Sequence, residues 1–101
     1  MSYLRVFASA IEPGDRDEVL RLFHEDVEPV FLKLPGCSSI ELAVTVEQSA
    51  GGLLDGLAIS RWATLAQMEE AVATQAARDS MERISALLRH APSIRVLEIL
   101  E

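Results

Sequence analysis

The chain has 101 residues, 50% of them hydrophobic, and it carries a formal net charge of −7. This length predicts a single domain over residues 1–101, near the lower limit at which a chain buries a self-sufficient core. The negative charge argues against nucleic acid and against an anionic membrane surface, because both need a basic protein surface. We therefore expect neither nucleic acid nor a membrane among its partners.

No segment of the sequence has the features of a membrane or exported protein. Its apolar runs fall short of the roughly 20 residues of a membrane-spanning helix, and no basic segment leads into an apolar one at the N-terminus. The only cysteine, Cys37, cannot form an internal disulfide, which fits a reducing compartment. The sequence therefore predicts a cytoplasmic protein.

Alternating apolar residues and turn signals predict strands, at Tyr3–Ile11, Ser39–Glu47, Leu53–Trp62 and Ser93–Leu100. Gln48–Gly52 contains paired glycines and is expected to form a hairpin turn. With a helix in each of the remaining intervals, the order is βαββαβ. This order is typical of an α+β, ferredoxin-like domain with a four-stranded antiparallel sheet.

The first helix is predicted to follow Pro13-Gly14, with Asp15 and Glu18 as a capping box. Its apolar stripe has the spacing of a core-facing helix: Val19, Leu20, Phe23, Val27, Val30, Phe31 and Leu34. Pro29 lies within this stripe. It should kink the helix or begin a new turn, because proline lacks the N–H that continues a helix.

The second helix is predicted to start at a capping box formed by Thr64 and Gln67. Its apolar spacing loses phase around Thr74–Asp79, so we expect an interruption there. Pro92 should end the helix. His90 is expected near its C-terminus, where the helix dipole favours a cation.

Two of the predicted strands are apolar on both faces. On the first strand, Leu4 and Val6 lie on one face and Phe7 on the other. On the third strand, Leu57 and Ile59 lie on one face and other apolar residues on the other. Two helices can cover only one face of such a sheet, and the other would be an apolar patch larger than monomers tolerate. We therefore expect a homodimer whose sheets pack face to face as a dimeric α/β barrel.

Further features are a first strand running into Pro13-Gly14, a helix ending in Pro35-Gly36, and a strand that delivers Trp62 into a capped helix. In these features the whole chain resembles the antibiotic biosynthesis monooxygenase-like family of dimeric α/β barrel proteins. That family includes cofactor-independent oxygenases of polyphenolic compounds, haem-degrading enzymes, quinol oxygenases and members without known activity. The resemblance implies the fold and a small-molecule site.

Trp62 matches the tryptophan that commonly ends the third strand in this family. In polyketide-oxidising members it acts with an Asn four residues earlier and a Tyr six residues later, where this chain has Ala58 and Met68. The polar positions of haem-degrading members are also apolar here, at Phe7, Ala71 and Met81. The resemblance therefore implies a protein without haem, and we expect no cofactor.

Cofactor-independent oxygenation needs a dry, aromatic-lined cavity, because an electron-rich phenolate or carbanion can itself reduce dioxygen. Strand parity and the resemblance together place candidate substrate-binding residues on the helix-facing side of the sheet: Phe7, Ser9, Ala58 and Ser60, with Phe23 and Met68 as further walls. Trp62 is the catalytic candidate that would stack on the ligand and donate its N–H. The structural alternative is a core tryptophan.

His24 is the candidate general base, because a histidine titrates near neutral pH. The alternative is a partly exposed histidine paired with Glu28; these two residues have metal-ligand spacing but no third ligand, so we predict no metal. Arg5 and Arg61 could hold a carboxylate or phenolate. Their alternative is structural pairing with carboxylates, at Asp55, Glu41 or Glu98.

The leading hypothesis is a cofactor-independent monooxygenase of a small aromatic, polyphenolic or quinol-like metabolite. The alternative is a non-enzymatic dimeric module of the same fold that binds a small ligand or another molecule. An enclosed cavity containing Trp62 near a titratable group would favour the enzyme, and an interior filled by side chains would favour the module.

Overall fold

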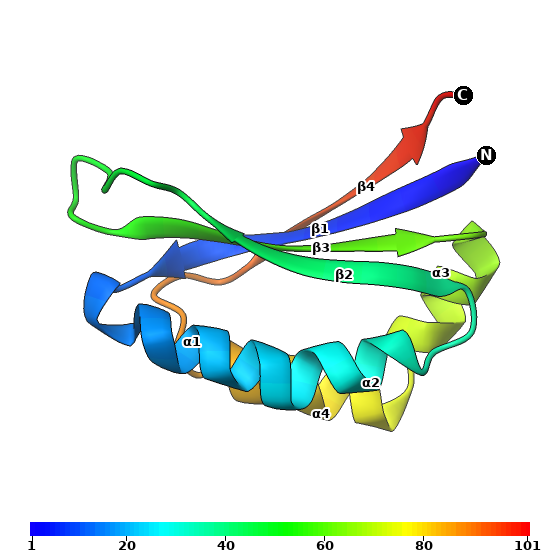
Figure 1. Cartoon of the computed structure of the whole chain (residues 1–101), viewed down its shortest axis with the longest axis horizontal. Helices are drawn as coiled ribbons and strands as arrows, with labels where there is room; N and C mark the ends of the chain where they lie inside the picture. The colour runs from blue at the N-terminus through cyan, green and yellow to red at the C-terminus, as the bar shows by residue number, and fades with distance from the viewer.

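A computed structural model describes residues 1–101 as a single antiparallel sheet lying over a layer of helices (Figure 1). The strands are β1 (Ser2–Ile11), β2 (Cys37–Val44), β3 (Leu54–Trp62) and β4 (Ser93–Ile99). They pair in the order β2-β3-β1-β4, and all neighbours are antiparallel. The predicted ferredoxin-like α+β fold is therefore confirmed.

The first helical region is one rod made of α1 (Arg16–Leu22), a π-helical turn η2 (Phe23–Val27) and α2 (Glu28–Leu32), preceded by a 3-10 turn η1 (Pro13–Asp15). In the π turn, the N–H of Glu28 donates to the carbonyl of Phe23. Pro29 follows directly after this turn, in the first turn of α2, so the predicted new turn is confirmed. The predicted Asp15–Glu18 capping box is wrong, because the Asp15 side chain caps no N–H and Glu18 instead bonds Arg21.

The second helical region is divided into α3 (Leu65–Val72) and α4 (Gln75–Ser85). Thr64 Oγ1 accepts from the N–H of Gln67 at 3.1 Å, which confirms the predicted cap. Thr74 caps α4 in the same way, at the predicted interruption. The expected dipole contact of His90 is wrong, because α4 ends at Ser85. None of the helices combines the length and apolar character needed to cross a membrane.

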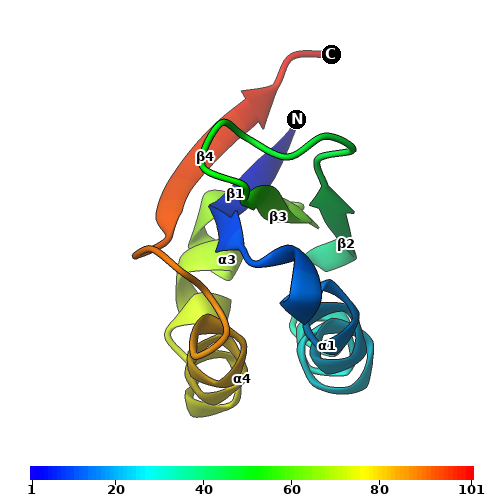
Figure 2. The same ribbon diagram turned by 90° about the vertical axis from the view of Figure 1, so that its left-hand side faces the viewer.

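All helices lie against one face of the sheet (Figure 2). Trp62 at 0% exposure and Phe31 at 1% form the centre of the core, with an edge-to-face contact and ring centroids 6.3 Å apart. Near the other end of β3, a Cβ on Gly56 would collide with the side chain of Ile11. Glycine therefore allows the sheet to approach this core residue closely.

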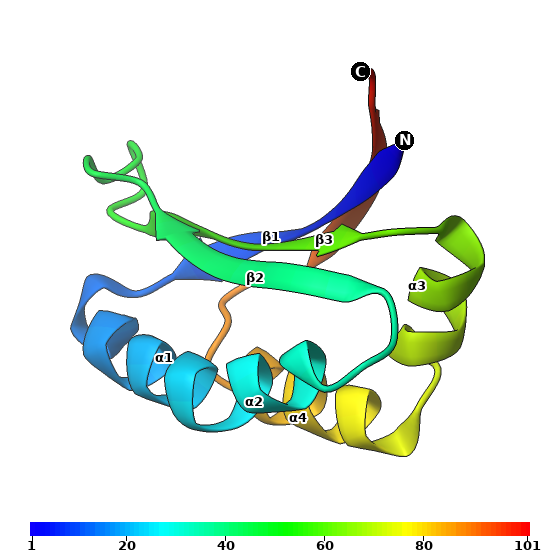
Figure 3. The ribbon, with the colours of Figure 1, turned by 45° about the vertical axis from the view of Figure 1, so that its right-hand side comes forward.

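The other face of the sheet has no covering element, and β4 curves away from the helices (Figure 3). Its half-buried apolar side chains come from the central strands: Leu4, Val6, Leu57 and Ile59. On β4, Leu97 is 39% exposed. We call this face the outer face. The strands are thus apolar on both sides, as the sequence predicts.

Candidate functional site

A narrow cavity of about 20 Å³ lies between the sheet and the helices. The residues that line it come from β1, β2, β3 and both helical regions: Phe7, Ser9, Ile11, Val19, Val27, Leu42, Gly56, Ala58, Met81, Ile84 and Leu88. This volume suits about one water molecule. Ser9 is the only side chain among them with a hydroxyl, amide or charged group, so the cavity is almost entirely apolar.

Small residues create this cavity. Ser9 pairs with Gly56, and Phe7 pairs with Ala58, on adjacent strands β1 and β3. Because cross-strand partners share a face, the short side chains of Ser9 and Ala58 leave space beneath the sheet that the helices do not fill, whereas Ile11 occupies the space beneath Gly56. The cavity therefore lies away from the end of β3 at which Trp62 packs on Phe31.

The structure divides the predicted site residues into two groups. Phe7, Ser9 and Ala58 line the cavity. The others are buried in the core and do not line it: Phe23, Ser60, Trp62 and Met68. The sequence places most of these side chains on one face, but their distance along the strands separates the tryptophan from the cavity.

The polar groups of the buried residues already have partners. The indole Nε1–H of Trp62 donates to Ser60 Oγ at 2.8 Å, and the Ser60 hydroxyl donates to the Arg5 carbonyl at 3.5 Å. The Ser9 hydroxyl donates to the His90 carbonyl at 2.7 Å. Ser9 can therefore still accept a hydrogen bond in the cavity, whereas the Trp62 donor is occupied.

His24 lies on η2 and faces solvent, with 56% of its side chain exposed. Its Nδ1 is 3.6 Å from Glu28 Oε1, and its ring meets the edge of Phe23. His24 does not line the cavity, so its position fits the alternative of a partly exposed histidine beside Glu28. No three His, Cys, Asp or Glu side chains come together in a group that could hold a metal ion.

A larger and more open groove of about 290 Å³ lies beside the cavity, between β1, β4 and α4. Phe7 and Met81 line both spaces and separate them. Three of the other lining residues are charged, namely Arg5, Arg78 and Glu82. The remaining ones are Phe31, Val72, Ala77, Ser85 and Ile94. The residues from α4 recur at helical spacing, and that spacing was the signal in the sequence for this missed half of the site.

Neither Arg5 nor Arg61 pairs with the carboxylates named as their structural alternative, Asp55, Glu41 and Glu98. Arg61 Nη2 donates to Ser2 Oγ at 3.0 Å and lies 3.9 Å from a carboxylate oxygen of Glu101. Arg5 makes no ion pair, and its burial lowers the pKa of its guanidinium. Arg5 is therefore a partly buried cation without a carboxylate partner.

Residues 2–83 match the family model described as antibiotic biosynthesis monooxygenase. Among solved structures, an antibiotic biosynthesis monooxygenase shares 22% identity at a TM-score of 0.70, with 100% of both chains covered. A Mycobacterium tuberculosis protein shares 20% identity at a TM-score of 0.68, covering 100% of this chain and 97% of that one. At such identities the likeness shows the fold alone. None of the curated proteins matches the chain in sequence.

Proposed function

We propose, from the premise that this chain belongs to the antibiotic biosynthesis monooxygenase family, that it is a cofactor-independent monooxygenase of a small aromatic, polyphenolic or quinol-like metabolite. The observation that carries the proposal is the apolar cavity that adjoins a groove across Phe7 and Met81. The groove, about 290 Å³ in volume, approaches the size of small-molecule sites, which start at about 300 Å³. Because methionine is flexible, movement of Met81 would join the two spaces.

The proposed reaction uses the electrons of the substrate to reduce dioxygen. A ring carbon that carries two hydrogens in the keto form of the substrate loses one as a proton, and the resulting carbanion forms a C–O bond with dioxygen. The peroxide takes up a proton, and the hydroperoxide then loses water to leave a carbonyl. One oxygen atom ends in the product and the other in water, so the substrate supplies all four electrons.

The residues of the cavity support this chemistry mainly by excluding water. Its walls are apolar apart from Ser9, whose oxygen can accept a hydrogen bond from a substrate hydroxyl. No titratable side chain lines the cavity, so the substrate must lose its proton before the carbon reaches the cavity. The groove carries Glu82, a carboxylate that can take this proton at the entrance.

A non-enzymatic small-ligand or interaction module of the same fold is the second candidate. The observation that favours it is Trp62, which is fully buried, donates its only N–H to Ser60 and lies outside the cavity, contrary to the arrangement expected of the enzyme. The cavity also has space for about one water molecule as it stands. A module would hold a ligand in the groove without consuming oxygen.

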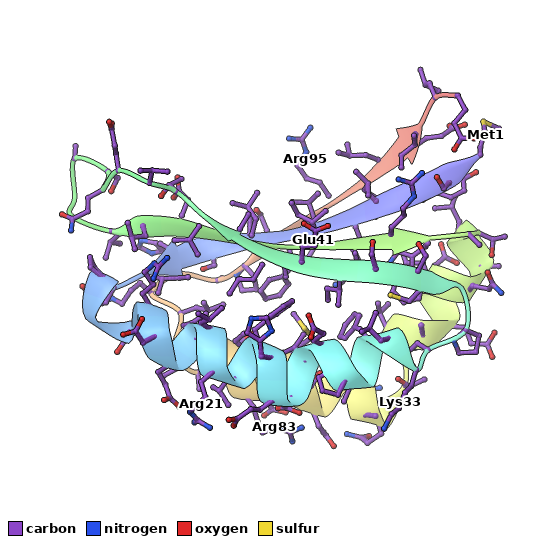
Figure 4. All side chains as sticks on the ribbon, in the orientation of Figure 1. Met1, Arg21, Lys33, Glu41, Arg83 and Arg95 are labelled. Carbon is purple, nitrogen blue, oxygen red and sulfur yellow. The ribbon has the colours of Figure 1, made fainter.

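We also propose that the protein is a homodimer through its outer faces. The register aligns Glu41 with Ile59, Ile59 with Val6, and Val6 with Arg95, so these four residues form one row across the sheet. Glu41 and Arg95 project away from the helices (Figure 4). They stand at opposite edges, because β2 and β4 are the edge strands.

This charged row defines how a second copy would pack. A two-fold axis that runs along the strands, between the sheets, superimposes the row on itself in reverse order. Glu41 of each protomer then faces Arg95 of the partner subunit, while Val6 and Ile59 pack between them. The dimer would thus bury the apolar centre of the outer face and form two ion pairs at its rim.

The cytoplasm is the compartment we propose for this dimer. Cys37 is the single cysteine of the chain, so no internal disulfide is possible. Its burial also raises the pKa of the thiol, which keeps it protonated and unreactive. Both properties suit a reducing environment.

Oxygen consumption separates the enzyme from the module. Purified protein would be mixed with hydroxylated naphthalenes and with anthrones, and oxygen uptake compared with the spontaneous rate. The monooxygenase proposal expects catalysed uptake for at least one substrate. Uptake at the spontaneous rate throughout the panel would leave the module as the account of this protein.

A further inference from the structure

Arg5 and Arg78 line the groove between β1, β4 and α4, and both lack a carboxylate partner. None of the ion pairs within 4.0 Å involves either residue, although the chain carries 16 Asp and Glu residues. Most other arginines of the chain do form ion pairs. Arg83, for example, lies on α4 like Arg78 and pairs with Asp26 of η2. Two unpaired cations in one groove would attract an anionic ligand.

The rest of the groove suits an aromatic ring. Phe7, Phe31 and Met81 provide apolar and aromatic walls, and Phe7 and Met81 also border the internal cavity. Arg78, Met81, Glu82 and Ser85 share one face of α4, so the charged and apolar walls come from the same helical surface. A ligand with a ring at one end and an anionic group at the other would match this arrangement.

We propose that the groove binds an aromatic carboxylate, with its carboxylate between Arg5 and Arg78 and its ring against Phe7 and Met81. Arginine suits this task because its planar guanidinium holds both oxygens of a carboxylate. Partial burial of Arg5 strengthens such a contact, since water competes less for the charge. As a description of the substrate, this inference rests on the proposed monooxygenase function; as a binding site, it stands without it.

The charge of Glu82 should weaken the binding of an aromatic carboxylate in the groove. It is the only carboxylate in the groove, and it lies one helical turn after Arg78 without forming an ion pair with it. Its charge repels a bound carboxylate and attracts the same arginine. Removal of this charge, in Glu82→Gln, is therefore expected to tighten the binding of an aromatic carboxylate.

The test compares binding of naphthoate with binding of naphthamide, its uncharged isostere, by isothermal titration calorimetry on the full chain. Wild type should bind naphthoate about 10- to 100-fold more tightly than naphthamide, the range expected for charge-assisted hydrogen bonds. Arg5→Gln and Arg78→Gln should each remove most of this preference, and Glu82→Gln should increase it. Circular dichroism and thermal unfolding verify that each variant is folded, and Arg5→Lys, which keeps the charge, should retain part of the preference.

The matched control is Arg16→Gln, which makes the same charge change on α1, outside the groove. It should leave naphthoate affinity unchanged. The inference is overturned if wild type does not bind naphthoate, if it binds naphthamide equally well, or if Arg16→Gln weakens binding as much as Arg5→Gln does. If Arg5→Gln fails to fold, the other two variants test the site: Arg78→Gln should weaken naphthoate binding, and Glu82→Gln should strengthen it.

Oxygen uptake with hydroxylated naphthoates distinguishes failure of this site from failure of the proposed function. Arginine-dependent naphthoate binding without oxygen uptake supports the site and contradicts the monooxygenase. Catalysed uptake with neutral anthrones, together with failure to bind naphthoate, supports the monooxygenase and overturns the site. Faster uptake for the carboxylate-bearing substrate, lost in Arg78→Gln, supports both.

Discussion

The indole N–H of Trp62 donates a hydrogen bond to the hydroxyl oxygen of Ser60, two residues earlier on the same strand, at 2.8 Å. Both residues are on the helix-facing side of β3, at 0% and 2% exposure. The bond closes a buried polar pair beside the aromatic contact with Phe31. Trp62 therefore stabilises the core at the junction of β3 and α3, and it leaves the cavity to smaller residues.

Replacement of Trp62 should lower stability substantially. Trp62→Phe removes a buried ring and the N–H that Ser60 accepts, which should cost about 2–4 kcal/mol of unfolding free energy. Urea unfolding followed by far-ultraviolet circular dichroism measures this cost. Ser60→Ala, which strands the buried indole N–H, should cost about 1–3 kcal/mol. A Trp62→Phe variant as stable as wild type would contradict the structural role.

The ion pair between Asp26 and Arg83 should make stability depend on acid pH. The hydrogen bonds from Arg83, at 2.6 and 2.8 Å, hold the pKa of Asp26 below its usual value. The pKa of Asp26 is thus lower in the folded state than in the unfolded state, where an aspartate has a pKa of about 3.9. The stabilisation is present above the unfolded pKa and is lost as the pH falls through the folded pKa.

Asp26→Asn tests this pH dependence. The variant should be less stable than wild type at neutral pH, and the difference should shrink below about pH 4. Unfolding by urea at a series of pH values measures the difference. Glu69→Gln serves as the control, because Glu69 is exposed on α3 and forms no ion pair. A difference that stays constant down to the lowest pH would show that the pair contributes nothing through charge.

The cap of α4 should contribute measurably to stability. Thr74 Oγ1 accepts from the N–H of Ala77 at 3.3 Å and donates to the carbonyl of Ala71 at 2.7 Å, so it connects both helices. Thr74→Ala should cost about 0.5–2 kcal/mol, and Thr74→Ser should restore most of the loss. Thermal unfolding measures the stability of both variants. Equal losses of stability in both would contradict a stabilising role of the Thr74 hydroxyl.

The proposed dimer depends on the row that runs from Glu41 to Arg95. Glu41→Arg should weaken dimerisation about 10- to 100-fold, because it would place like charges together at the rim. Glu41→Arg combined with Arg95→Glu should restore it. Sedimentation velocity over a concentration series measures the dissociation constant, with Glu69→Arg on α3 as the control. A monomer mass for wild type at micromolar concentration would contradict the dimer itself.

Much of the fold could be predicted because its signals are local. Alternation of side chains indicates the strands, Thr64 and Gln67 mark a helix start, and Pro29 marks a new turn. The cap at Asp15 failed because the chain enters α1 through a 3-10 turn, which leaves the Asp15 side chain away from the free N–H groups. Such entry geometry is not visible in residue spacing.

The candidate site was harder to predict because it depends on packing between distant segments. The alternation of side chains on β3 places Ala58 and Trp62 on one face of the sheet. Only the packing of Phe31 on Trp62 shows that the space beneath the Trp62 end of the strand is filled. The absence of a partner for Arg5 is also a tertiary fact, since carboxylates are common in the sequence. The short side chains of Ser9 and Ala58 were the available signal for the cavity.

The most direct test of the account is oxygen uptake by Ala58→Leu with the best anthrone or quinol substrate. Ala58 lines the cavity, so leucine fills the space in which the reacting carbon would sit. Ala66→Leu, on the exposed surface of α3, is the matched control. We predict uptake at least about tenfold lower for Ala58→Leu, because displacement of the substrate disrupts its reaction geometry, and unchanged uptake for Ala66→Leu. Wild-type uptake by a folded Ala58→Leu protein would contradict the placement of the active site beneath the sheet.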